Sequence, residues 1–162
     1  MKKFELTENY KMYFGRKLFQ IRALVTIKDV VEEGETGGYI EKEGNLSQFG
    51  KSWVSGNAQV FGNARVTGNS RVTENARVSG KAFVGGNSCV TENAYVSGNA
   101  LVTGNSCVCG NAHVYGCAFV TGNSRVTENA RVSGNVIAGG NSCVSGNEYV
   151  HGDELLLGDA NL

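Results

Sequence analysis

From Val54 onward, hydrophobic and polar positions repeat every six residues to the end of the chain. The segments VSGNAQ, VFGNAR and VTGNSR follow one another without an insertion, and Ala or Ser stands two residues before most of the aliphatic positions. Residues two apart in a strand share a face, so the small residue and the Val both point inward. The Gly-Asn pair supplies a corner, because Gly and Asn tolerate positive φ. The pattern predicts short strands joined by tight corners, which is a parallel β-solenoid.

A longer period is superimposed on the six-residue one. The segment TGNSRVTENARVSG occurs unchanged at 67–80 and 121–134, and NSCV recurs at 87, 105 and 141. These copies are separated by multiples of 18 residues. Three six-residue units therefore form one triangular coil, and residues 18 apart stack at about 4.8 Å. Residues 54–162 give six such coils.

The repeat unit, an aliphatic residue with a small residue two positions earlier, resembles the hexapeptide-repeat family of left-handed parallel β-helix proteins. The resemblance covers residues 54–162 and implies an all-β fold of about six 18-residue coils. The left-handed sense comes from the resemblance alone, since crossovers between parallel strands are normally right-handed. The segment before the repeats resembles the N-terminal part of uncharacterised bacterial and phage or prophage β-helix proteins. The resemblance rests on GG, an aromatic residue, IE, NLS and a Trp, in that order. This second resemblance implies a phage-related origin and no established chemistry.

Residues 1–52 differ in composition from the repeats, because Lys and Glu are frequent there. They predict two strands joined near Phe14-Gly15-Arg16, and GETGGY predicts a turn. The first coil of a solenoid has unpaired backbone groups that invite aggregation, so a cap is required. We therefore divide the chain into a small N-terminal β-rich cap, residues 1–52, and a β-helix, residues 53–162.

Charge and composition narrow the classes of partner. Lys plus Arg and Asp plus Glu each number 15, so no net field favours nucleic acid or an anionic membrane. The charged N-terminal stretch lacks the apolar core of a signal peptide, and no apolar run reaches the length of a membrane span. We expect a cytoplasmic location in a bacterial host cell. The five Cys residues, scattered through the repeats, predict reduced thiols.

One side of the predicted prism, here called the apolar face, has a column of large apolar side chains above Arg65. Burying one of them contributes about 1.5–3 kcal/mol, and an exposed stripe of this kind is typical of an interface. We predict self-association, and the family resemblance favours a trimer over a dimer. The alternative is that the N-terminal segment covers the stripe. The predicted oligomer interface comprises Phe83, Leu101, Phe119, Ile137, Leu155 and Leu157.

A second side, the aromatic face, has aromatic, imidazole and guanidinium groups in vertical register. Such groups are enriched at protein interfaces and binding hot spots. We predict that this face binds a protein of the bacterial host. The alternative is that aromatic residues simply suit strands and that Arg covers a solvated surface. The predicted partner-binding residues are Arg77, Tyr95, His113, Tyr115, Arg131 and Tyr149.

The third side, the thiol face, has Trp53, Arg71, Cys89, Cys107, Arg125 and Cys143 in one column. Cys109 lies beside Cys107, but a structural zinc site needs four ligands, and the neighbouring positions are Thr and Arg. We therefore predict no metal site. Cys89 and Cys107 lie close enough for a disulfide by Cα spacing, yet parallel side chains hold the Cβ atoms about 4.8 Å apart. Free thiols are the prediction.

Further polar features are interpreted as structural. The inward Ser column that begins at Ser70 is expected to share hydrogen bonds along the stack, and the Asn column beginning at Asn69 to serve a corner. Glu148 and Glu154 fall at inward positions near the end of the repeats, where we expect the last coil to loosen.

An enzymatic function must be weighed, because many proteins of the resembled family are acyltransferases. Those enzymes have a catalytic His near a subunit junction and loops that leave the coils, whereas this chain has only His113 and His151 and no insertion in residues 54–162. The carbonic anhydrases of the family need three metal-binding His. We expect no catalytic residues, metal or cofactor, and His113 is the one candidate base if acyl transfer occurs.

These observations favour a non-enzymatic, oligomeric protein of phage or prophage type that docks a host protein through one solenoid face. Inhibition of a bacterial defence system, anti-CRISPR-like or similar, is one such role. A structural phage or prophage component and an acyltransferase are the alternatives.

Overall fold

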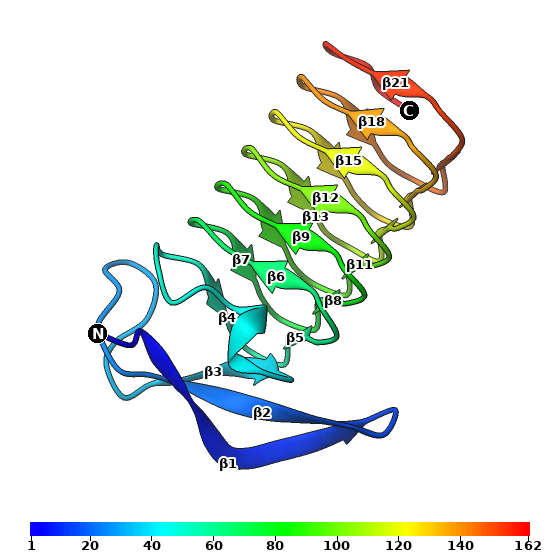
Figure 1. Cartoon of the computed structure of the whole chain (residues 1–162). Helices are drawn as coiled ribbons and strands as arrows, with labels where there is room; N and C mark the ends of the chain where they lie inside the picture. Colours follow the sequence, from blue (N-terminus) through cyan, green and yellow to red (C-terminus); the bar gives the residue numbers. More distant parts are fainter.

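The computed structural model describes residues 1–162 as a stack of coils with a hairpin across its N-terminal end (Figure 1). The hairpin consists of β1 (Phe4–Tyr13) and β2 (Arg16–Ala23), which pair antiparallel. The two residues between them, Phe14 and Gly15, have φ values of 45° and 75°, as a tight two-residue hairpin turn requires. The predicted pair of strands and its turn are confirmed.

Eighteen two-residue strands then recur every six residues and form three parallel sheets. In each, the first residue points outward and the second, usually Val, points into the tube. The thiol face contains β4 (Trp53–Val54), β7 (Arg71–Val72), β10 (Cys89–Val90), β13 (Cys107–Val108), β16 (Arg125–Val126) and β19 (Cys143–Val144). The aromatic face contains β5 (Gln59–Val60), β8 (Arg77–Val78), β11 (Tyr95–Val96), β14 (His113–Val114), β17 (Arg131–Val132) and β20 (Tyr149–Val150). The apolar face contains β6 (Arg65–Val66), β9 (Phe83–Val84), β12 (Leu101–Val102), β15 (Phe119–Val120), β18 (Ile137–Ala138) and β21 (Leu155–Leu156).

Parallel pairing between residues 18 apart confirms the predicted coil. Leu101, for example, pairs with Phe83 on one side and with Phe119 on the other. The backbone N–H of Leu101 donates to the carbonyl of Ala118 in the next coil at 2.9 Å. Inward Val and Ala side chains fill the tube, and those of the middle coils are at most 1% exposed. The fold is therefore an all-β parallel β-solenoid.

The parallel stack begins before the regular repeat. Strand β3 (Thr36–Ile40) pairs antiparallel with β2 and parallel with β5, so it joins the hairpin to the first regular coil. Ile40 pairs with Val60, and Leu46, just after the short helix η1 (Glu43–Asn45), pairs with Val66. Both offsets are 20 residues in place of 18. An irregular coil therefore adds a seventh turn to the six predicted.

The interpretation of GETGGY as a turn is only partly right. Gly34 has a φ of 89° and lies in a turn, but Thr36 to Gly38 already belong to β3. Gly37 and Gly38 have no positive φ, and an added Cβ on either would lie within 3 Å of a backbone oxygen. This pair of glycines thus permits close approach of two backbones.

Hydrogen bonds along the stack reinforce the corners. Starting at Asn69, the Nδ2 of each Asn donates to the Oδ1 of the Asn 18 residues later at 3.0–3.1 Å, ending on Asp159. The Ser column behaves differently from the prediction. The hydroxyl of Ser70 lies 2.6 Å from the Thr67 carbonyl and 3.2 Å from the Val84 carbonyl, so it bonds to backbone and not to neighbouring Ser.

The last coil keeps its backbone register. Arg131 donates its N–H to the Glu148 carbonyl at 2.8 Å, and Ile137 donates to that of Glu154 at 2.9 Å. The expected loosening at these residues is therefore wrong. Both Glu side chains are exposed, because no coil covers the positions above them. No helix in the structure has the length and apolar character needed to cross a membrane.

Candidate protein-binding face

The aromatic face places the six predicted partner-binding residues on one flat surface. Tyr95 pairs in register with Arg77 and His113, and Arg131 pairs with His113 and Tyr149. Tyr115 follows the inward Val114 of β14 and lies beside this column. The predicted vertical register is confirmed.

Ring stacking orders the centre of this face. The rings of Tyr95 and His113 are stacked, with centroids 4.7 Å apart and planes 13° apart. The Tyr115 ring also lies close to His113, with the centroids 4.7 Å apart and the planes inclined by 42°. A second imidazole–phenol pair, Tyr149 and His151, lies at β20, the last strand of the aromatic face. Such aromatic pairs add about 0.5–1.5 kcal/mol beyond the area that they bury.

Two buried serines hold the phenol groups of the aromatic face. Ser79 and Ser133 are each 5% exposed. The Ser79 hydroxyl lies 2.8 Å from the Tyr95 hydroxyl, and Ser133 donates to the Tyr149 hydroxyl at 3.2 Å. Tyr115 also donates to Tyr149, at 3.0 Å. The three tyrosines are therefore fixed before any partner arrives, which lowers the side-chain entropy lost on binding.

The charge state of the face follows from its neighbours. Partial burial, together with the Arg131 guanidinium, lowers the pKa of His113, so the imidazole is neutral at pH 7. The hydrogen bond that Tyr115 donates to Tyr149 raises the pKa of Tyr115. Arg77 and Arg131 form no salt bridge, so the two guanidinium groups are the uncompensated charges of this face.

The tip of the hairpin reaches the lower edge of the aromatic face. Arg77 donates from Nη1 to the Tyr13 hydroxyl at 2.8 Å, and the ring of Tyr13 lies 5.2 Å from that of Phe61. Phe61 is consequently only 9% exposed. Tyr13 could not be assigned to this face from the sequence, because nothing in residues 1–52 indicates which face of the solenoid the hairpin tip contacts.

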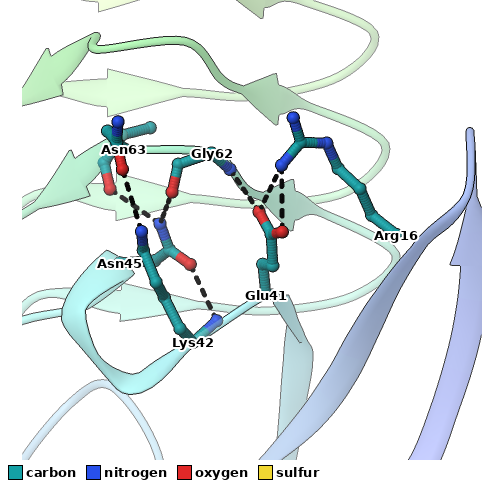
Figure 2. A network of polar contacts seen from close by, with 7 residues as sticks. Arg16, Glu41, Lys42, Asn45, Gly62 and Asn63 are labelled. Atoms are coloured by element: carbon teal, nitrogen blue, oxygen red, sulfur yellow. Dashed lines mark hydrogen bonds and ion pairs between the residues drawn. The ribbon is translucent and has the colours of Figure 1, made fainter.

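A polar network anchors the hairpin and the irregular coil to the solenoid (Figure 2). Arg16 at the start of β2 binds both carboxylate oxygens of Glu41, at 2.9 and 3.0 Å, and the Gly62 N–H donates to the same carboxylate at 2.6 Å. The fully buried Asn45 donates to the carbonyls of Gly62 and Ala64 at 3.2 and 2.9 Å. A shallow depression of about 350 Å³ lies beside this network. Neither His113 nor His151 lines this or any of the other four depressions.

The apolar face has the predicted column in register, and its upper part is strongly exposed. Exposure is 37% for Ile137, 59% for Leu155 and 56% for Leu157, whereas Phe83, Leu101 and Phe119 are half-buried. Figure 1 shows the hairpin lying across the N-terminal end of the stack and not alongside β9 to β21. The N-terminal segment therefore leaves this column uncovered.

Four of the five free cysteines lie on or beside the thiol face, and the lowest residue of its column is covered. Trp53 is 2% exposed because the Phe4 ring packs edge-on against it, with the centroids 6.5 Å apart. Cys89 and Cys107 are paired in register. No group of three or more His, Cys, Asp or Glu side chains is arranged to hold a metal ion.

Two segments of the chain, residues 58–74 and 94–110, match the family model described as the YdcK beta solenoid repeat. Each segment is close to one coil in length, and both lie within the regular part of the stack. The match and the observed fold place the chain among β-helix proteins. No curated protein matches the chain.

Proposed function

We propose that this chain is a non-enzymatic, oligomeric binding protein that docks another protein through the aromatic face. The observation that carries the proposal is the stacked and hydrogen-bonded set of Tyr95, His113, Tyr115 and Tyr149, which shares its face with two guanidinium groups that form no salt bridge. Tyr and Arg are the residue types that dominate binding hot spots. A flat surface with rigid side chains loses little entropy on association.

The arrangement of the rings favours a protein over a carbohydrate as partner. A sugar packs its C–H groups against the open face of an aromatic ring. Here the His113 ring stacks on Tyr95 and has the Tyr115 ring 4.7 Å away, so the ring face that packs on Tyr95 is not open to a sugar. The face combines aromatic rings, hydroxyl groups and guanidinium groups, which suit the mixed polar and apolar surface of a folded protein.

The partner class and the biological setting rest on the resemblance to phage and prophage β-helix proteins. A host protein is accordingly the partner to test first, and inhibition of a host defence system is the role to test once the partner is known. A structural role is the second candidate, favoured by the Asn columns and the coil-to-coil backbone bonds that make the solenoid stiff.

Arg131→Ala is expected to weaken binding of the captured host protein about tenfold, and Tyr95→Ala by a similar factor, because each removes a pre-positioned interface group. The matched control is Arg125→Ala, which removes an exposed Arg that also precedes an inward Val but lies on the thiol face. The partner is first captured from bacterial extract by the immobilised chain. Dissociation constants are then measured with the purified partner by calorimetry. Equal losses for Arg131→Ala and Arg125→Ala would contradict the assignment of the face.

We propose in addition that copies of the chain associate through the apolar face, with a trimer favoured. Phe119→Glu is expected to convert the assembly to single chains of 17.2 kDa, because a carboxylate in an apolar contact loses its hydration without a partner. Phe14→Glu is the control, since Phe14 is 89% exposed at the hairpin tip. Mass is measured by light scattering. A wild-type chain that is already monomeric at micromolar concentration would exclude this assembly.

A further inference from the structure

The thiol face has a four-residue column in which two thiols lie between two guanidinium groups. Arg71 pairs in register with Cys89, Cys89 with Cys107, and Cys107 with Arg125. In-register neighbours on parallel strands lie about 4.8 Å apart, inside the Cα range of about 4.4–6.8 Å that a disulfide spans. Both cysteines are free and half-buried. The fold therefore places two thiols on adjacent coils, beside two cations.

The two thiols are electrostatically unequal. Cys107 donates its thiol hydrogen to Cys89, and this bond lowers the pKa of Cys89 to about 7. Burial, Cys109 and Glu74 act in the opposite direction, and Arg71 adds to the lowering. The same hydrogen bond, followed by burial, raises the pKa of Cys107 above its ordinary value. Burial is also the first cause that raises the pKa of Cys109, to about 11. Cys89 is therefore the thiol of the cluster that ionises first as the pH rises.

Arg71 gives an independent indication that this position suits an anion. Its Nε atom is buried and has no hydrogen-bond partner within the chain. A buried donor without a partner is costly, and a negative charge on the neighbouring Cys89 reduces that cost. Cys143, in the same column, has Arg125 on one side and a bridge to Asn161 on the other, and so has no adjacent thiol.

We propose that Cys89 and Cys107 form a reactive dithiol that a peroxide oxidises to a disulfide between adjacent coils, with Cys89 as the attacking sulfur. In the first step the Cys89 thiolate attacks one peroxide oxygen, the O–O bond breaks, and hydroxide leaves, so that Cys89 becomes a sulfenic acid. In the second step the Cys107 sulfur attacks Cys89, the S–O bond breaks, and the Cys107 proton and the hydroxyl group leave as water. Two electrons pass from the dithiol to the peroxide, as the balance requires.

The parallel geometry makes this disulfide easy to reduce. The Cβ atoms must approach from about 4.8 Å to about 3.8 Å, so the coil spacing has to tighten locally. Strained disulfides have higher reduction potentials than relaxed ones. We therefore expect glutathione to reverse the reaction, which makes the pair a reversible modification site.

Peptide mapping of the full chain can test the pairing directly. The chain has no Lys or Arg between Lys81 and Arg125, and Glu92 lies between the two cysteines. Trypsin combined with a Glu-specific protease therefore separates residues 82–92, which contain Cys89, from residues 93–125, which contain Cys107, Cys109 and Cys117. After treatment with one equivalent of hydrogen peroxide and alkylation of free thiols, we expect these peptides to be linked in the wild type, Cys109→Ser and Cys117→Ser. We expect no linkage in Cys107→Ser, where dimedone should label Cys89.

A second readout follows the same pair without an oxidant. Iodoacetamide should alkylate Cys89 with a pH midpoint near 7, and Cys107→Ala, which removes the donor, should move that midpoint toward the ordinary value of about 8.5. Cys143 is the internal control for access, because it is also half-buried. Linkage through Cys117, no linkage in the wild type, or a Cys89 midpoint that Cys107→Ala leaves unchanged would each overturn the proposal.

Discussion

Gly37→Ala is expected to lower the free energy of unfolding by about 3 kcal/mol, although the substitution adds one methyl group. The new Cβ would lie 2.5 Å from the carbonyl oxygen of Val54 and 2.7 Å from Cγ1 of Ile21. The first of these atoms is backbone, so it cannot rotate away. To accommodate the methyl group, β3 must move away from both the first coil and the hairpin, which loosens the cap.

Gly44→Ala is the matched control for this prediction. Gly44 lies in η1 of the same irregular coil, and an added Cβ there meets no atom within 4 Å. We expect a change within about 0.5 kcal/mol. Urea denaturation followed by circular dichroism measures both variants. If the two alanine variants unfold at the same urea concentration, the explanation is wrong, and glycine is not required at position 37 by the close approach of the backbones at β3.

The regular coils could be predicted from the sequence because each inward residue faces the same environment. A tube lined by Val and small side chains leaves one register for every strand, so the period of 18 residues fixes which residues are neighbours. The columns on all three faces follow from that register. The aromatic stacking of Tyr95 and His113 was therefore accessible from the sequence as a neighbour relation, although the ring angles were not.

What covers an outward residue could not be predicted in the same way. Alternation places Trp53 outward correctly, yet it is buried, because Phe4 folds back on it. The irregular coil escaped detection for a related reason. Ile40 and Leu46 keep the six-residue spacing, but eight residues separate Leu46 from the next inward residue, Val54, and this break hides the coil from a search for the repeat. Which of Cys89 and Cys107 donates the hydrogen bond depends on side-chain rotamers. The repeat pattern of the sequence does not specify these rotamers.

Lys3 lies where the N-terminal cap closes the tube, and its ammonium group is buried there. Its side chain is 4% exposed, and Nζ donates to the carbonyl and the hydroxyl of Ser52 at 2.8 and 3.2 Å. No carboxylate forms a salt bridge with it. Burial consequently lowers the pKa of Lys3 from 10.5 to about 8.

The free energy of unfolding should therefore rise with pH between about 8 and 10.5. Over that interval the unfolded chain keeps the Lys3 proton while the folded chain has lost it, so raising the pH favours the folded state. A lowering from 10.5 to about 8 corresponds to a total gain of about 3 kcal/mol. Below pH 8 the cost of the buried charge is present in full, and above 10.5 it is absent.

Lys3→Met isolates this contribution, because the Met side chain is unbranched, is only one atom shorter than that of Lys and has no proton to lose. The tyrosines and the other lysines titrate in both proteins, so they cancel when the two stability curves are subtracted. We expect the wild type to gain about 3 kcal/mol relative to Lys3→Met between pH 8 and 10.5, measured by urea denaturation at several pH values. A constant difference across this range would mean that the Lys3 ammonium is hydrated in solution and that the hairpin does not seal the N-terminal end of the tube.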